Sequence, residues 1–398
     1  MHILIAPNAF KHSLTAEAAA TAILKGLEES RLNFTAQCFP VGDGGDGTGD
    51  LLMSRLEAKT ISAPARDPFG RERMTYYGLS ASETAAAAAA SGTAIIGTDK
   101  GQASTAIIEM ANASGLRLLA PQELAPLHAA SWGTGDLIRD ALEKGADRIL
   151  VGMGGSATVD GGTGILSALG VRFLDANGHE ITDLPIGLTD LASIDLKGLD
   201  PKLKTVELTV LCDVDNPLLG PEGAANVFGP QKGASKKDVQ QLEQALQRFE
   251  AVVRQQLDVA LADLPKGGTA GGAAAGLHGV LKARLVDGID YYLNVSGFGA
   301  ALERAQWVIT GEGSLDEQTL KGKGPFGVAN AAKSKGLPVI GLAGRLPREK
   351  IPSLDSYFDV LLPINHEAAP LADALPYTAD NLTATARAIG NLLSISGA

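Results

Sequence analysis

Residues 148–169 read RILVGMGGSATVDGGTGILSAL, which is a short apolar run, a glycine-rich loop and then apolar residues at helical spacing. A helical pattern around 136–144 precedes the run 148–151, and a second helix is expected to pass through Ile165 and Leu169. Strands that alternate with helices in this way form mostly parallel sheets covered on both faces. The stretch therefore predicts an α/β fold.

The same alternation recurs along the chain. The longest helix is expected over 236–257, with Ser235 as its N-cap and Asp238 three residues further on. For the first helix, Ser13 and Thr15 are both candidate caps. Further strands are expected at 2–6, 206–211, 307–310, 338–343 and 358–363, and further helices at 14–29, 328–335 and 381–394.

Length and charge restrict the class of protein. At ~150 residues per domain, 398 residues predict two or three domains. Lys and Arg number 34 against 45 Asp and Glu, and a net charge of −11 argues against a nucleic-acid partner, which needs a basic face. The two cysteines form no disulfide framework, the start has no secretory leader, and no apolar run reaches ~18 residues. We therefore expect a cytoplasmic protein without a membrane partner.

Glycine is over-represented, at 48 of 398 residues or about 12%, against a usual ~7%. In open α/β sheets, ligands bind where loops meet at the carboxyl ends of the strands. We therefore expect the glycine loops to share one crevice. Five loops follow strand candidates, and most also carry Asp, Ser, Thr or Glu: 42–48 (GDGGDGT), 152–164, 213–216 (DVDN), 311–316 (GEGSLD) and 341–345 (GLAGR).

The residue types in these loops suit a phosphorylated ligand. Glycine lets backbone N–H groups approach an anion, and carboxylates beside such a cradle indicate a divalent cation or hydroxyl recognition. Glu312 and Asp316 add further carboxylates after the strand that ends at residue 310. Lysines near the loops suit a polyphosphate: Lys11, Lys232, Lys321 and Lys323.

Several enzyme classes lack their motifs here. The chain has no P-loop, no protein-kinase motifs, no G-x-S-x-G elbow and no metal-ligand spacing among its six histidines. Gly152, Gly154 and Ala157 match G-x-G-x-x-A, with Asp175 18 residues further on. An NAD-dependent oxidoreductase of a small hydroxy acid therefore stays open as an alternative. A non-catalytic sugar-acid-binding protein is another.

Seven motifs, taken in order, resemble those of the bacterial glycerate kinases that phosphorylate D-glycerate with ATP. They are IAPNAFKHSLTA, VGDGGDGT, GTGDLI, GMGGSATVDGG, CDVDNPLLG, FGPQKGA and GEGSLDEQTLKGK, and the resemblance runs from Ile3 to about Leu392. It implies ATP and Mg²⁺, D-glycerate as acceptor, and usually 2-phosphoglycerate as product. It leaves a homodimer open.

The resemblance also implies a domain organisation. A Rossmann/flavodoxin-like domain is expected from residues 1–80 and 285–398. A second α/β domain, 81–284, is inserted between them, with the active site in the cleft. No linker separates these domains in the sequence, and the clearest composition breaks are 85–90 and 266–276 (KGGTAGGAAAG).

The loops and the resemblance together suggest roles for individual residues. The expected catalytic residues are Lys11, Asp46 and Asp213, and the expected metal ligands are Asp213 and Asp316. Substrate contacts are expected at Ser13, Asp43, Gly44, Gly45 and Lys232. Phosphate or nucleotide contacts are expected at Gly154, Gly155, Ser156, Gly311, Gly313 and Lys323.

The chain departs from the family pattern at four places. Asn8 stands where the family commonly has Asp, and Asp46 where it usually has Glu. Ser314 stands where an Arg is common, and residues 82–102 look like extra sequence. These departures bear on acceptor preference and on the roles of single residues.

Overall fold

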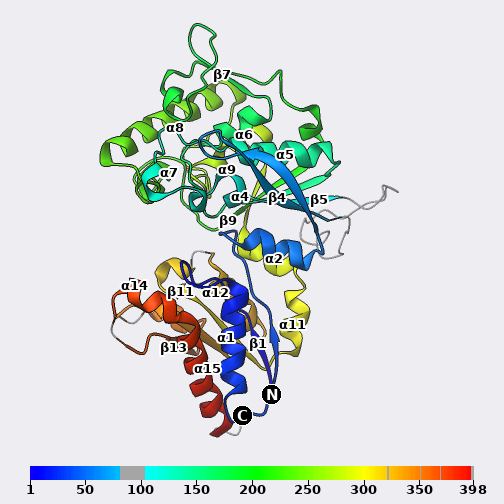
Figure 1. Cartoon of the computed structure of the whole chain (residues 1–398), viewed down its shortest axis with the longest axis vertical. Coiled ribbons are helices and arrows are strands. Elements are labelled where there is room, and N and C mark those ends of the chain that lie inside the picture. Colours follow the sequence, from blue (N-terminus) through cyan, green and yellow to red (C-terminus); the bar gives the residue numbers. More distant parts are fainter. Residues whose placement is uncertain (81–103, 321, 350, 368, 396–398) are drawn as a thin grey trace. The chain divides into compact units, whose positions relative to one another are not determined.

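The computed structural model describes residues 1–80, 104–320, 322–349, 351–367 and 369–395 (Figure 1). They form two compact units, one from 1–43 with 289–395 and one from 44–80 with 104–288. This division differs from the expected boundary at residue 80, because strands β3 (Lys59–Arg66) and β4 (Glu72–Ser80) pair within the sheet of the second unit. The segment 82–102, expected to be extra sequence, lies outside the described residues.

The first unit is built on a five-stranded sheet in the order β13-β12-β11-β1-β2, and every pairing in it is parallel. Ile3, Leu4 and Ile5 of the central strand are fully buried, as expected for a parallel strand covered on both faces. The strands are β1 (His2–Ile5), β2 (Thr35–Cys38), β11 (Trp307–Ser314), β12 (Val339–Arg345) and β13 (Val360–Pro363).

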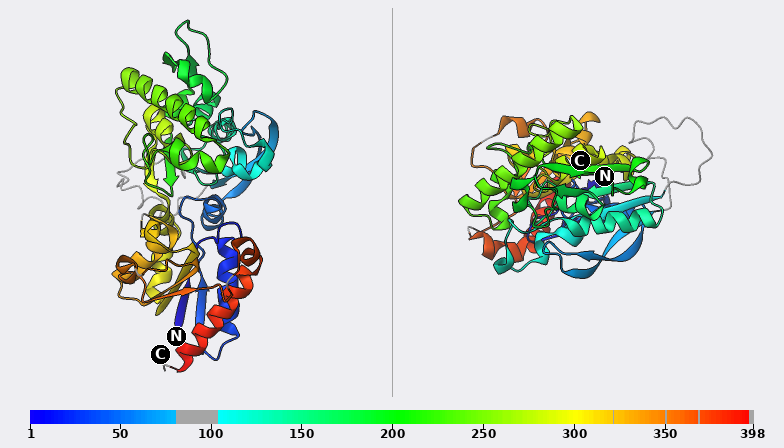
Figure 2. Two further views of the ribbon diagram at one scale, coloured as in Figure 1. Left: turned by 90° about the vertical axis from the view of Figure 1, so that its left-hand side faces the viewer. Right: turned by 90° about the horizontal axis from the view of Figure 1, so that it is seen from above.

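Two long helices of the first unit pack closely. A Cβ on Gly26 of α1 (Ala16–Glu28) would lie 2.2 Å from the carbonyl oxygen of Thr383 on α15 (Thr378–Ile395), so glycine permits the approach. Figure 2 shows these helices on one side of the sheet, with α11 (Phe298–Arg304) and α12 (Gly324–Ser334) on the other. Of the two candidate caps of α1, Thr15 is the cap, because its hydroxyl accepts from the backbone N–H of Ala18. The hydroxyl of Ser13 donates to the carbonyl of Leu375 instead.

The second unit has a six-stranded sheet in the order β10-β9-β6-β5-β4-β3. Its strands β5 (Thr105–Glu109), β6 (Arg148–Gly152), β9 (Glu207–Cys212) and β10 (Arg284–Asp287) are parallel, whereas β3 and β4 form an antiparallel hairpin at one edge. A separate antiparallel pair is formed by β7 (Arg172–Leu174) and β8 (Ser193–Asp195). The α/β class and the mostly parallel sheets are confirmed, and the hairpin is an addition that alternation did not predict.

The helix predicted over 236–257 is α8 (Lys236–Leu257), and its Leu242, Leu246, Phe249 and Val253 are fully buried. No described helix has both the length and the apolar character that crossing a membrane requires. The other α-helices of the described residues are α2 (Thr48–Arg55), α4 (Ala111–Ser114), α5 (Trp132–Glu143), α6 (Thr163–Ala168), α7 (Ala224–Phe228), α9 (Ala273–Leu281), α10 (Gly288–Val295), α13 (Pro352–Asp355) and α14 (Leu371–Ala374).

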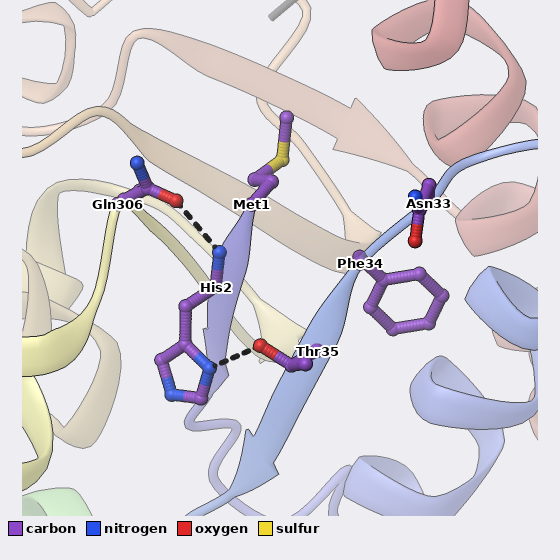
Figure 3. A pocket seen from close by; sticks show the side chains of 6 residues that line it. All are labelled: Met1, His2, Asn33, Phe34, Thr35 and Gln306. Carbon is purple, nitrogen blue, oxygen red and sulfur yellow. Dashed lines mark hydrogen bonds between the residues drawn. The ribbon is translucent and has the colours of Figure 1, made fainter.

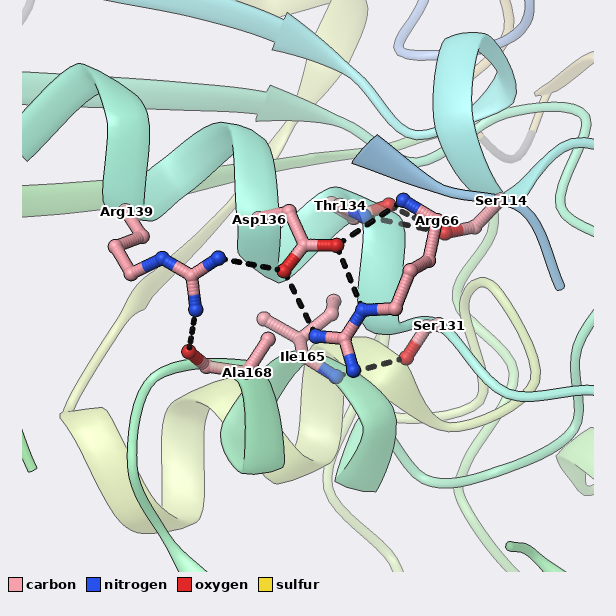
Figure 4. Close-up of polar contacts among 8 residues, drawn as sticks. All are labelled: Arg66, Ser114, Ser131, Thr134, Asp136, Arg139, Ile165 and Ala168. Carbon is pink, nitrogen blue, oxygen red and sulfur yellow. Dashed lines mark hydrogen bonds and ion pairs between the residues drawn. The ribbon is translucent and has the colours of Figure 1, made fainter. Parts of the chain in front are cut away.

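The motif GTGDLI lies on α5 and anchors that helix (Figure 4). Asp136, which is only 5% exposed, accepts from the backbone N–H, Nε and Nη2 of Arg66 at 3.1, 2.8 and 2.7 Å, and from Nη2 of Arg139 at 3.1 Å. A Cβ on Gly133 would lie 1.8 Å from the carbonyl oxygen of Arg66. Asp136 and Gly133 of this motif therefore hold β3 against α5.

Replacing Ser235 by alanine is expected to lower the free energy of unfolding by about 1 kcal/mol. The Ser235 hydroxyl accepts from the backbone N–H of Asp238, and the Asp238 carboxylate accepts from the backbone N–H of Ser235, so the change removes half of a capping box. Urea denaturation of the variant, beside Ser334→Ala at an exposed site, measures the effect. A loss below about 0.3 kcal/mol would contradict the capping role.

Candidate active site

Three of the predicted glycine loops come together in the second unit. A Cβ on Gly154 would lie 2.1 Å from the backbone nitrogen of Asp46, and the N–H of Gly154 donates to the carbonyl of Gly44 at 3.0 Å. A Cβ on Gly44 would in turn lie 3.0 Å from the carbonyl oxygen of Leu211, near the end of the strand that precedes Asp213. The loops meet backbone to backbone because neither Gly154 nor Gly44 has a side chain.

The other two predicted loops belong to the first unit, and most of their residues continue strands. Strand β11 continues through Ser314 and β12 through Arg345, with Gly311 paired to Leu342. The expected strand ends at 310 and 343 were therefore wrong, because glycines in these strands keep their backbone pairing. A Cβ on Gly311 would lie 2.3 Å from the carbonyl oxygen of Leu342, whereas Gly313 adjoins the backbone of Lys11.

Glu312 is the most perturbed carboxyl of the first unit's described residues. It points from β11 into a site where it is only 5% exposed, and burial raises its pKa to about 7. Asp43 raises this pKa further, while Lys323, Lys11 and the hydroxyl of Thr319 lower it. Nζ of Lys323 lies 3.9 Å from the Glu312 carboxylate, and Thr319 donates to it at 3.3 Å. Glu312 was noted in the sequence but not among the expected catalytic residues.

Asn8 orients Asp43 within the same cluster. Nδ2 of Asn8 donates to Oδ2 of Asp43 at 2.7 Å, and Oδ1 of Asn8 accepts from the backbone N–H of Ala9. The backbone N–H of Gly324, at the start of α12, reaches the same Asp43 oxygen at 3.4 Å. Both side chains are buried. The departure from Asp to Asn at position 8 thus places a donor against the predicted substrate contact Asp43.

Asp46, a predicted catalytic residue, is held by two residues that the sequence analysis missed. Nη1 of Arg117 lies 2.8 Å from its carboxylate, and Glu109 also hydrogen-bonds with it. Glu109 is 2% exposed and accepts from the backbone N–H groups of Gly47 at 2.6 Å and Gly49 at 2.9 Å. Burial, followed by the Asp46 hydrogen bond, raises the pKa of Glu109 to about 8. A carboxylate ending the apolar strand 105–109 was the available sequence signal.

Lys232 lies inside the second unit, 3% exposed. Its Nζ donates to Oγ of Ser156 at 2.8 Å and to the carbonyl oxygen of Thr158 at 2.7 Å. Burial lowers the pKa of Lys232 to about 7, although Asp160 and Asp213 act in the opposite direction. Its amine therefore contacts the predicted phosphate loop rather than solvent.

The glycine-rich stretch 266–276 packs beneath the 152–164 loop. A Cβ on Gly271 would lie 2.0 Å from the carbonyl oxygen of Thr158, and one on Gly276 would lie 1.9 Å from that of Gly161. At the start of the stretch, Nζ of Lys266 bridges Asp215 at 2.5 Å and Asp287 at 2.9 Å. Close backbone packing therefore explains these glycines, which the sequence analysis saw only as a break in composition.

The dinucleotide alternative does not fit the second unit. Strand β6 is followed by the loop 153–162 before α6 begins at Thr163, so no helix opens at Gly154. Strand β7, which precedes Asp175, pairs with β8 and not with β6. The G-x-G-x-x-A match is therefore not part of a Rossmann nucleotide-binding unit, in which the glycine turn opens a helix and the acidic residue follows the next strand of the sheet.

The two predicted metal ligands lie in different units, Asp213 after β9 and Asp316 after β11. Ser314 donates to the Asp316 carboxylate at 3.2 Å. The described residues contain no group of three or more His, Cys, Asp or Glu side chains arranged for a metal ion. Each of Asp213 and Asp316 offers one carboxylate, which is the kind of protein ligand that Mg²⁺ takes together with substrate phosphates.

A pocket of about 300 Å³ lies at the amino-terminal ends of strands β1, β2 and β11 in the first unit (Figure 3). It is lined by Met1, His2, Asn33, Phe34, Thr35 and Gln306. Nδ1 of His2 hydrogen-bonds with the Thr35 hydroxyl at 2.8 Å. None of the predicted site residues lines it.

The whole chain is similar to proteins named glycerate kinases. Residues 3–394 match the model of the glycerate kinase family. A glycerate kinase of Bacillus subtilis (strain 168) is 40% identical over 396 residues, which cover 100% of this chain and 98% of that protein. A glycerate 2-kinase of Escherichia coli (strain K12) is 39% identical over 399 residues, covering 99% and 98%.

A solved structure agrees in fold. The crystal structure of a Salmonella typhimurium LT2 protein described as glycerate kinase 2 matches with a TM-score of 0.77 and 39% identity, covering 100% of this chain and 99% of that one. Since the family model and these relatives extend along nearly all residues, the chain belongs to the glycerate kinase family.

Proposed function

We propose that the chain transfers the γ-phosphoryl group of ATP to D-glycerate and forms 2-phosphoglycerate. The observation that carries this proposal is the full-length similarity to the E. coli glycerate 2-kinase, at 39% identity over 399 residues. The seven motifs quoted from the sequence lie within the matched residues.

The first unit supplies charges suited to the transfer. Phosphoryl transfer depends on positioning and on neutralising the charge of the moving group, which suits Lys11 and Lys323. Glu312, whose pKa is raised to about 7, takes the proton of the acceptor hydroxyl at neutral pH. The hydroxyl oxygen then bonds to the γ-phosphorus, the bond from that phosphorus to the β–γ bridging oxygen breaks, and ADP leaves.

The second unit supplies backbone donors. The loop at Gly154, Gly155 and Ser156 and the loop at Gly44 and Gly45 would bind phosphate oxygens or the glycerate carboxylate through N–H groups. Mg²⁺ bound with ATP would be held by Asp213 or Asp316 together with phosphate oxygens, and it would supply charge neutralisation.

A coupled assay with ATP and D-glycerate tests the function, followed by ³¹P NMR of the product. We expect ADP formation that depends on D-glycerate, with the phosphorus signal of 2-phosphoglycerate. A 3-phosphoglycerate signal would overturn the regiochemistry and leave the kinase activity standing. Intact ATP in the presence of D-glycerate and related hydroxy acids would overturn the whole proposal.

Replacing Lys11 or Asp213 by alanine is expected to lower kcat/KM at least about tenfold, because each removes a charged hydrogen-bonding group worth roughly 1.5–3 kcal/mol. Steady-state kinetics at varied ATP and varied D-glycerate measure each effect. Lys59→Ala and Asp190→Ala, at exposed positions, serve as matched controls. If both site variants stay near the wild-type kcat/KM, these role assignments are wrong.

A further inference from the structure

Lys232 is a buried lysine whose amine contacts two oxygen atoms. Its Nζ donates to the Ser156 hydroxyl and the Thr158 carbonyl, and the two carboxylates that favour its charged form belong to Asp160 and Asp213. A buried ammonium is unfavourable unless acceptors surround it. The side chain is only 3% exposed, so these contacts replace its hydration.

The loop around this amine has unmet hydrogen-bonding capacity. The hydroxyl of Thr158 is fully buried and has no hydrogen-bond partner among the residues that the structure describes. It belongs to the residue whose carbonyl oxygen accepts from Lys232. The Ser156 hydroxyl and the Thr158 carbonyl contact the amine, and two carboxylates act on it, so its surroundings consist of oxygen atoms of the kind that hard cations take.

The loop segment is the predicted phosphate cradle. Ser156 follows Gly154 and Gly155, and Gly155 has a positive φ of 68°. The backbone of the segment is also tied at Ala157, whose N–H donates to the carbonyl of Ser114. Lys232 comes from a separate motif 76 residues further along, so it fixes the loop from the interior.

We propose that the ammonium group of Lys232 is a tethered internal cation, which holds the 154–158 loop in its ligand-binding shape and occupies a site for a free monovalent cation. Lys232 is then a positioning residue that acts through Ser156 and Thr158. The activity readout rests on the proposed function, whereas the stability readout does not.

Cation rescue of Lys232→Ala tests the proposal. The variant opens space for an exogenous cation, and we expect its kcat/KM to be at least about 100-fold below wild type in tetramethylammonium chloride. Replacing that salt by ammonium or potassium chloride at constant ionic strength should raise kcat/KM of the variant at least tenfold, and the increase should saturate with salt concentration. The wild-type enzyme should not distinguish these salts.

Two further variants and a second readout separate charge from packing. Lys232→Met fills the space without charge and should show no rescue. Lys202→Ala removes another lysine that donates to a backbone carbonyl, at Leu142, and should also show no salt preference. The midpoint of thermal unfolding of Lys232→Ala should rise in ammonium relative to tetramethylammonium. If that variant does not fold in buffer, its refolding yield from urea in the two salts replaces the midpoint.

The outcomes are distinguishable. Equal behaviour of Lys232→Ala in ammonium, potassium and tetramethylammonium salts, in both activity and stability or refolding yield, overturns the inference. Wild-type activity in Lys232→Met, or an equal salt response in the wild type, also overturns it. If the wild type fails to phosphorylate D-glycerate while ammonium stabilises Lys232→Ala alone, the proposed function fails and the internal cation stands.

Discussion

Replacing Gly154 by alanine is expected to lower kcat/KM for ATP and D-glycerate by about 100-fold or more, since misplacing catalytic groups by about 1 Å has effects of this size. A Cβ at this position would lie 2.1 Å from the backbone nitrogen of Asp46 and 2.2 Å from the backbone carbon of Gly45. Backbone atoms cannot swing aside as a flexible side chain does, so the two glycine loops must separate. The added methyl should also lower the free energy of unfolding by about 1–3 kcal/mol.

Gly152→Ala is the matched control for this prediction. It lies two residues away at the end of β6, has the same chemical change, and its Cβ would meet nothing closer than the Ile108 carbonyl oxygen at 3.9 Å. Steady-state kinetics and urea denaturation of both variants compare the effects. A Gly154→Ala enzyme with kcat/KM within about threefold of Gly152→Ala would show that close contact of the loops is not needed for catalysis.

Replacing Glu312 by glutamine is expected to lower kcat/KM by about 10²- to 10⁴-fold, the usual contribution of a general base. The carboxyl is buried beside Lys323, Lys11 and Asp43, and its pKa is raised to about 7, so the wild-type kcat/KM should rise as the pH increases through 7. Glutamine keeps the size of the side chain and cannot accept the proton. The rising limb of the pH profile should therefore be missing in the variant.

Whereas Glu312→Gln should lose activity, its stability relative to the wild type should increase as the pH rises. The folded-state pKa of Glu312 lies above its ordinary value of 4.5, so its contribution to stability is fully present below about 4.5 and is lost as the pH rises through about 7. The midpoint of thermal unfolding of Glu312→Gln should therefore rise relative to that of the wild type as the pH increases from about 5 to 8. Glu317→Gln, at an exposed neighbouring position, should leave both profiles unchanged. An unaltered pH profile in Glu312→Gln would exclude Glu312 as the base.

Local patterns predicted much of the fold. The helix Lys236–Leu257 has the expected bounds because its apolar spacing and its capping box are both local in sequence. The strand ends predicted for β11 and β12 were wrong because glycine favours turns. Only pairing with a neighbouring strand shows that Gly311 continues the sheet. The β3–β4 hairpin was missed because alternation elsewhere favoured parallel strands.

The candidate site was predicted only in part, because some of its features are local in sequence and others depend on contacts between distant residues. The glycine loops were found from composition, because backbone approach to a ligand requires the same residue wherever it occurs. Glu109 was missed because its partners, Gly47 and Gly49, lie 62 and 60 residues away. The contacts of Lys232 with Ser156 and Thr158, 76 and 74 residues away, likewise depend on the folded chain.

The strand order of the first unit has a consequence for biosynthesis. Strand β1 pairs with β2 on one side, but its other neighbour is β11, where Ile3 pairs with Trp307. At roughly 5–20 residues per second, the ribosome makes β11 roughly 15–60 s after β1. During that interval the backbone N–H and C=O groups on one edge of β1 have no strand to pair with, while the second unit emerges between the two strands. Completion of the first sheet therefore waits until translation is nearly finished.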